Sequence, residues 1–215
     1  MAYLDEATVA PDVRAKLTVK AAAGTLESVF PGAMKGPMKF LKRDRGVKFP
    51  YTPTIMMQHQ ATYGTHQPIH SNFQYKYFQN YSLQEFTITA PFTAHTIAEG
   101  KYMEGVLHFL KSAMKIGFGE GDKQRGVPPP VLEFSAWGPA WAKNIPVVVT
   151  NFTYNIDGSV DYTWPTSVPT FMDSMLPLVV DIIITLAPTY STKSTRLEYS
   201  SENFYKGGLL QKGYV

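Results

Sequence analysis

The 215-residue chain contains no cysteine, few charged side chains and no long apolar run, and each absence excludes a class of protein. Without cysteine there is no disulfide framework, no thiolate zinc site and no cysteine nucleophile. The longest apolar stretch, Leu176–Leu186, is interrupted by Pro177 and Asp181 and is far shorter than the roughly 20 residues of a membrane span. The opening "MAYLDEATVAPDVRAK" lacks a basic segment followed by an apolar run. We therefore expect a soluble protein without a secretory signal, assembled in the cytoplasm.

Charged residues make up 17% of the sequence, below the roughly 25% of ordinary globular domains, whereas Tyr and Phe occur 13 times each. Protein interfaces are depleted of charge and enriched in aromatic residues, but β-strands are also rich in aromatics. Composition alone therefore leaves two interpretations open, a subunit of an assembly and an ordinary β-rich domain. The net charge of +3 is too small to indicate a nucleic-acid-binding protein.

Residues 1–48 differ from the rest of the chain because they contain few large apolar side chains and a basic run. Such a segment has too little apolar surface for a core of its own, so we predict an N-terminal docking arm. A solvated, flexible terminus is the alternative. The basic run carries one acidic residue, Asp44, against six cations: Lys35, Lys39, Lys42, Arg43, Arg45 and Lys48.

From Phe49 onward the sequence has the pattern of strands, over 49–64 and 72–94, interrupted later by one helix over about 96–116. In the second strand-like segment the apolar residues alternate, which predicts that Phe86, Ile88, Ala90 and Phe92 share one face. In the helix, apolar residues recur at intervals of three and four, which predicts one buried stripe. The stripe comprises Met103, Val106, Leu107, Leu110, Ala113 and Met114.

Three further strands are predicted, over 131–137, 145–157 and 176–188. The last is apolar on one face and half apolar around Asp181 on the other, as in strands buried on both faces or lying between subunits. We expect a mainly β (α+β) fold with an antiparallel sheet and one helix, comprising residues 49–190. The polar tail 191–215 is predicted to be a C-terminal docking extension, anchored by Leu197, Phe204, Leu209 and Leu210.

No constellation of residues indicates catalysis. His59, His66 and His70 lie close together, but the surrounding segment is a poor helix and contains no carboxylate to complete a metal site. Glu133 and Asp181 lie in apolar strands, and nothing in the sequence places them together as an acid–base pair. Neither a nucleophile elbow nor a phosphate-binding loop occurs. We expect no enzyme activity, no metal and no cofactor.

The segment "NFQYKYFQNYSLQEF" interleaves aromatic residues with Lys76, as a stacking platform for single-stranded nucleic acid would. It carries a single cation, however, and the basic run of residues 35–48 is separate from it. A single-stranded nucleic-acid-binding β-barrel is therefore kept as an alternative function.

Several ordered segments resemble one family. "GVPPPVLEFSAWG", "NIPVVVTNFTYNI" and "VDYT" are similar to segments of the tail-tube-like baseplate proteins of contractile-tailed phages, in particular the tube initiator and tube cap proteins of T-even-like phages. The preceding "GVLHFLKSAMKIGFG" and the following "IIITLAPTYS" and "FYKGGLLQKGYV" extend the likeness. It covers residues 49–215, strongly over 104–190, and is weak over 1–48. Some relatives carry a further C-terminal module, which leaves open the ring of the tube that this chain would form.

The resemblance implies a β-sandwich of two crossed sheets with a flanking helix. It also implies a hexameric ring whose inner strands join into one continuous barrel around a channel. Such a ring lies in the virion at the baseplate–tail tube junction, on a baseplate hub protein. There it initiates polymerisation of the major tail tube protein or of a second initiator ring, while phage DNA passes through without specific binding. A sheath initiator is a further candidate partner, and a major tail tube subunit is the alternative identity.

Under this resemblance the basic run, the loop "GEGDKQRG" and the central carboxylate of the last strand become candidate subunit or ring contacts. The prolines of "PPPV" would form a stiff connector, because consecutive prolines favour an extended chain and disfavour helix before them. The candidate contacts are Lys39, Lys42, Arg43, Arg45, Glu120, Asp122, Lys123, Arg125 and Asp181. The residues expected to fix packing and geometry are Pro128, Pro129, Pro130, Phe134, Trp137 and Phe152.

Overall fold

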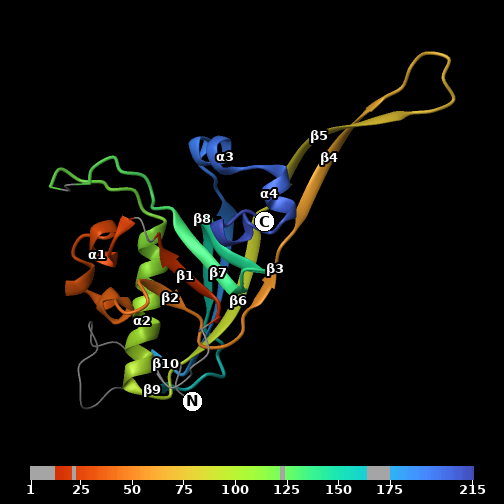
Figure 1. Ribbon diagram of the computed structural model, residues 1–215. Coiled ribbons are helices and arrows are strands. Elements are labelled where there is room, and N and C mark those ends of the chain that lie inside the picture. The colour runs from red at the N-terminus through yellow and green to blue at the C-terminus, as the bar shows by residue number, and fades with distance from the viewer. Residues whose placement is uncertain (1–12, 21–22, 122–123, 164–174) are drawn as a thin grey trace.

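The fold is mainly β, with one antiparallel seven-stranded sheet and several short helices (Figure 1). The computed structural model of the chain describes residues 13–20, 23–121, 124–163 and 175–215. In sheet order the seven strands are β2 (Gly46–Lys48), β1 (Lys16–Val19), β7 (Leu132–Gly138), β8 (Ala142–Asn155), β11 (Val179–Pro188), β6 (Phe86–Thr93) and β3 (Thr54–Met56). Two separate pairs are β9 (Tyr162–Thr163) with β10 (Leu176–Pro177) and β4 (His59–His66) with β5 (Tyr75–Leu83).

The sheet curls on itself so that β6 and β7, which are three positions apart in it, face each other across the core. The ring centroids of Phe86 on β6 and Phe134 on β7 are 5.4 Å apart. In a flat sheet these strands, three positions apart, would be separated by about 14 Å. The predicted alternation is confirmed on β6, where Phe86, Ile88, Ala90 and Phe92 are buried. On β11 the buried residues are Val180, Ile182, Ile184 and Leu186.

The predicted helix is α2 (Ile97–Ala113), which packs over one face of the curled sheet. Its first turn is fixed by a capping box, in which the Thr96 hydroxyl accepts from the Glu99 amide and the Glu99 carboxylate accepts from the Thr96 amide. Four residues of the predicted stripe are fully buried, whereas Leu107 and Met114 are half-buried. The four buried residues are Met103, Val106, Leu110 and Ala113.

The described part of the N-terminal segment packs onto the domain and does not extend from it as a separate arm. β1 lies inside the sheet between β2 and β7, and Leu17 is fully buried. Residues 26–41 fold onto α2, where Gly105 permits an approach so close that a Cβ there would lie 3.0 Å from the Pro37 carbonyl oxygen. The short helices of this region are α1 (Leu26–Val29), η2 (Ala33–Lys35) and η3 (Pro37–Leu41). The segment docks, but on the domain's own sheet and helix.

The C-terminal tail is helical and packs against the N-terminal end of β8. It comprises α3 (Thr192–Glu198), α4 (Ser201–Tyr205) and η4 (Leu210–Lys212). Of the four anchors expected here, Leu209 is fully buried, whereas Leu197 is 75% exposed. The Asn144 amide donates a hydrogen bond of 3.2 Å to the Gln211 carbonyl and ties the tail to the sheet.

We expect Phe134→Ala to lower the free energy of unfolding by about 3–5 kcal/mol, because it leaves a cavity at the centre of the curled sheet. Trp137→Ala should cost less, because 39% of the Trp137 surface is exposed. Urea denaturation of the two variants and the wild type measures both effects. Equal losses would contradict this view of where the core lies.

Candidate assembly interface

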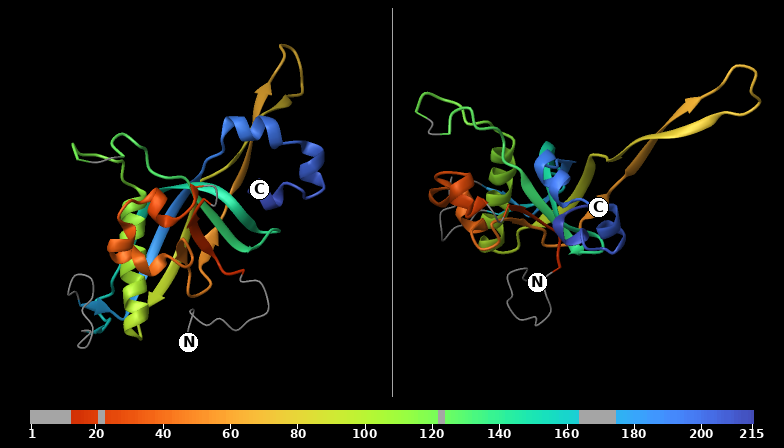
Figure 2. Two further views of the ribbon diagram at one scale, coloured as in Figure 1. Left: turned by 60° about the vertical axis from the view of Figure 1, so that its left-hand side comes forward. Right: turned by 45° about the horizontal axis from the view of Figure 1, so that its top comes forward.

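A long hairpin, β4 with β5, leaves the body of the protein and projects away from it (Figure 1, Figure 2). Its pairs run from His59 with Leu83 to His66 with Tyr75. Within the described residues no strand pairs with either outer edge of this hairpin. A two-stranded hairpin alone in water is marginally stable at best.

The composition of the hairpin is unusual for a surface element. Between His59 and Leu83 the one residue with a full charge is Lys76. Strands exposed at an edge normally carry charges that prevent unwanted pairing, and interface cores are depleted of charge. The hairpin therefore has the composition of a buried contact while it lies outside the domain. Its strand aromatics, all more than half exposed, are Tyr63, Tyr75, Tyr77, Phe78 and Tyr81.

Aromatic side chains occupy both faces of the hairpin. Tyr63 and Phe78 meet edge to face with centroids 5.8 Å apart. On the opposite face the ring of Tyr77 covers Gly64 so closely that any Cβ there would collide with it. Covering one face would leave the other in water, so we expect the hairpin to be inserted between surfaces.

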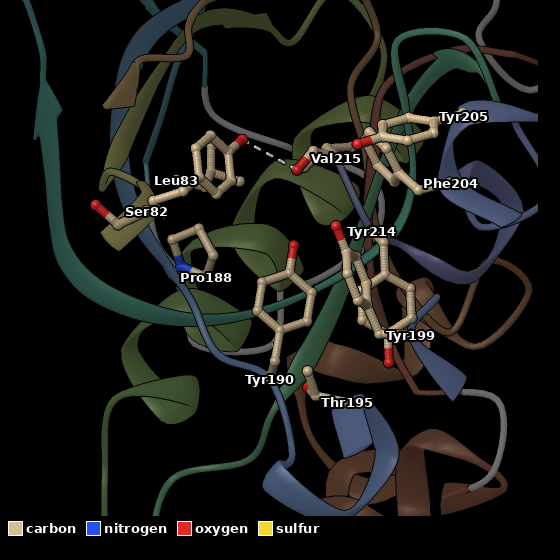
Figure 3. A pocket seen from close by; sticks show the side chains of 11 residues that line it. Ser82, Leu83, Pro188, Tyr190, Thr195, Tyr199, Phe204, Tyr205, Tyr214 and Val215 are labelled. Carbon is tan, nitrogen blue, oxygen red and sulfur yellow. Dashed lines mark hydrogen bonds between the residues drawn. The ribbon is translucent and has the colours of Figure 1, made fainter. Parts of the chain in front are cut away.

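A pocket of about 640 Å³ lies at the base of the hairpin, and we call it the aromatic pocket (Figure 3). The hairpin contributes one wall, and the end of β11 with the C-terminal tail contributes the others. No charged side chain is among the described residues that line it. The lining comprises Tyr81, Ser82, Leu83, Pro188, Tyr190, Thr195, Tyr199, Phe204, Tyr205, Tyr214 and Val215.

The walls of the aromatic pocket are held by ring stacking and hydroxyl hydrogen bonds. Tyr190 and Tyr214 stack with centroids 5.5 Å apart, and Tyr199 lies 5.9 Å from Tyr214. The Tyr190 hydroxyl donates to the Gly213 carbonyl at 2.9 Å, and the Tyr81 hydroxyl donates to the Val215 carbonyl at 3.2 Å. Such a cavity suits apolar or aromatic side chains, because its walls are mainly aromatic rings and carry no charged side chain.

Burial raises the pKa of Tyr190 from 10.0 to about 12, and the neighbouring Tyr81 and Tyr214 add to the shift. Burial, followed by the influence of Tyr199, also raises the pKa of Tyr81. Both hydroxyls therefore stay protonated across the physiological range and act as hydrogen-bond donors.

The sequence did not indicate this pocket. Its tyrosines belong to segments that are far apart in the chain, and the tail was expected to be anchored by aliphatic residues. The density of aromatics in "YSTKSTRLEYSSENFY" was the available signal.

The four predicted contacts of the basic run lie together on the surface around η3, on the side of the molecule away from the hairpin. Lys39 and Lys101 both lie over the ring of Phe40, at 5.0 and 5.9 Å from its centroid. These two ammonium groups are thereby held near each other over one apolar ring. The four exposed cations are Lys39, Lys42, Arg43 and Arg45.

The charged loop after α2 is a separate projection. Its base is closed by backbone hydrogen bonds between Gly117 and Val127 (3.1 Å) and between Gly126 and Gly117 (2.8 Å). Glu120 and Arg125 are exposed, whereas the predicted contacts Asp122 and Lys123 lie outside the described residues. Within the connector to β7, Pro128 is exposed, and Pro129 and Pro130 are half-buried.

The remaining predicted residues divide between the core and the surface. Phe134 is fully buried, Phe152 is half-buried against the core, and Trp137 points partly outward. Asp181 is exposed near the start of β11, where its strand pairs with β6 and β8 and not with the basic run or the loop. The structure thus brings together the cations around η3 but not the whole predicted contact set.

No cluster of side chains suited to metal binding is found in the described part of the chain. Within it, no three His, Asp or Glu side chains gather as a metal site would require. His59 instead shares a hydrogen bond with the Tyr81 hydroxyl. Glu133 and Asp181 lie on β7 and β11, which β8 separates.

The sheet itself has an open edge on β8. β7 pairs with β8 as far as Val147, and β8 then continues to Asn155. Over this second half, within the described residues, β8 is paired with β11 alone. Its other edge is a row of backbone donors and acceptors available to a further strand.

We expect the stability of the protein to fall as the pH rises from about 10 to 12. Below pH 10 Tyr190 is neutral in both states, but above it the unfolded chain loses a proton that the folded chain retains. Tyr190→Phe should lower the stability at neutral pH by about 1 kcal/mol, through the lost hydrogen bond, and should flatten the alkaline decline. Urea midpoints at pH 8, 10 and 11 measure this, and parallel pH profiles of variant and wild type would contradict it.

Comparison with known proteins does not assign a family to this chain. No protein-family model matches the chain, and no curated protein matches it. Among the described helices, none has the length and apolar character needed to traverse a lipid bilayer.

Proposed function

We propose that this protein is a structural subunit of a phage tail, forming a hexameric ring at the baseplate–tail tube junction. The ring initiates polymerisation of the tail tube and continues the DNA channel. The observation that carries the proposal is the combination of an open edge on β8 with a long, nearly uncharged aromatic hairpin. A protein acting as a monomer would leave both in water, whereas a subunit of an assembly covers them.

The open edge of β8 supports a closed ring. A strand from a neighbouring copy that pairs with the second half of β8 would satisfy its free backbone groups. Such a contact joins two different surfaces, so it repeats from copy to copy and ends when the ring closes. Closure leaves no sheet edge, which is how barrels remove this liability.

The two faces of the sheet differ in a way that suits a channel wall. α2 covers one face. The other face, over β6, β11 and the second half of β8, carries small polar side chains, Ile183 and one carboxylate, Asp181. In the proposed ring this part of the second face lines the channel, where six carboxylates and no described cation would keep DNA phosphates from adhering. The outward residues are Thr87, Thr89 and Pro91 on β6, Thr185 on β11, and Asn151, Thr153 and Asn155 on β8.

The resemblance to tube initiator and tube cap proteins supports the same proposal. Its strongest part, residues 104–190, comprises most of α2 and the strands β7, β8 and β11, which build the helix-covered sheet. A mainly β, antiparallel fold is compatible with the sandwich that the resemblance implies. That the fold is of the tail-tube type is part of the proposal.

The partners proposed for the ring are a baseplate hub protein on one side and the major tail tube protein or a second initiator ring on the other. The cations around η3 lie on the side that α2 covers, so they would face outward in the ring. A sheath initiator with an acidic surface would fit them. The protein acts by presenting a preformed edge and needs no catalytic group.

Electron microscopy and mass photometry of the purified protein test the proposal. We expect closed rings of six 24.0-kDa copies, about 144 kDa, that do not lengthen without the tube protein. Long tubes formed by the protein alone would instead identify a major tail tube subunit. A monomer whose DNA binding falls steeply with salt would favour the single-stranded nucleic-acid-binding barrel.

A further inference from the structure

We infer that the tip of the β4–β5 hairpin of one copy docks in the aromatic pocket of a second copy. The inference rests on the proposed function, because it supplies a contact between neighbouring subunits. It is carried by an exposed apolar tip and a pocket without charged side chains, which the same molecule holds far apart.

The hairpin tip presents two apolar side chains to solvent on an ordered turn. Ile69 is 87% exposed and Phe73 is 72% exposed. The Ser71 amide donates to the Pro68 carbonyl at 3.2 Å, and the Ser71 hydroxyl accepts from the Phe73 amide at 3.1 Å. Because these bonds fix the turn, the side chains project from a defined surface and pay little ordering entropy on docking.

The aromatic pocket matches this tip in chemistry and size. Its wall is composed mainly of tyrosine and phenylalanine rings, and the Tyr81 and Tyr190 hydroxyls already bond to backbone carbonyls. A volume of about 640 Å³ falls within the range of roughly 300–1,000 Å³ found for pockets that hold small ligands, so an isoleucine and a phenylalanine side chain fit. Aromatic pairs formed there would add edge-to-face or stacked contacts.

The tip has no access to the pocket of its own chain. Tyr81 and Leu83 line the pocket at the start of the hairpin, and the strand then extends to Tyr75. Eight residues at about 3.3 Å each place the tip roughly 25 Å from the pocket. Figures 1 and 2 agree that the hairpin extends away from α4 and the C-terminus. A second copy is therefore the source of the docked tip.

The two surfaces also limit what the contact can build. Tip and pocket are different patches, so a head-to-tail contact passes from copy to copy, and it forms a ring where the rotation between copies closes and an open filament where it does not. A reciprocal exchange between two copies would instead stop at a dimer. The same experiment distinguishes these two results.

The absence of cysteine allows a clean cross-linking test. Asn72→Cys, between the tip side chains, and Ser201→Cys, on α4 beside the pocket, are prepared as separate full-length proteins, mixed, oxidised and run on a non-reducing gel. Both sites are exposed and keep Ile69, Phe73 and the pocket lining intact, so each variant is expected to fold and to dock. We expect about tenfold more disulfide-linked dimer than from Asn72→Cys mixed with Ser28→Cys, because docking raises the effective concentration of the two thiols. Ser28 is an exposed control on the side away from the hairpin.

A double variant at the tip, Ile69→Ser with Phe73→Ser, completes the test, with mass photometry as the measurement. We expect a folded protein whose rings are lost at the concentration where the wild type forms them. Rings that persist in this variant, or cross-linking no greater than in the control, would overturn the docking contact and leave the proposed ring intact. Specific cross-links found only in dimers or open filaments would keep the contact and overturn the ring. A wild-type monomer at all concentrations would overturn both.

Discussion

The fold depends on the two-sided pairing of β11. This strand is hydrogen-bonded along its length to β6 on one side and to β8 on the other, and its four buried residues form the floor of the core. The pairing holds the curl that brings Phe86 against Phe134, and it carries β8 beyond the end of β7. The open edge, the position of α2 and the pocket at the end of β11 all follow from this central strand.

Much of this framework was predictable because it depends on local periodicity. The alternation from Phe86 to Phe92 and the helical stripe from Met103 to Ala113 each report one buried face, and the structure buries those residues. The pattern of residues 49–64 also predicted strand, but not that β3 joins the sheet while β4 leaves it. Strand propensity is the same in both places, since only the partner differs.

The candidate interface was less predictable because it combines distant segments. The N-terminal segment has few large apolar residues, yet Leu17 is buried. It pairs with Phe134 on β7, a partner that lies far along the chain. The aromatic pocket joins a hairpin strand, the end of β11 and a tail that appeared polar. Charge alone indicated the cations around η3 but gave no reason to separate them from Asp181, which lies on β11.

The place of β1 in the sheet also orders the folding of the chain in time. Lys16 pairs with Ser135, so β1 has no partner on that side until β7 has been synthesised. The β4–β5 hairpin, in contrast, closes between residues near each other in the chain, and both of its strands are made before β7. The aromatic hairpin is therefore synthesised before the sheet from which it projects can be completed.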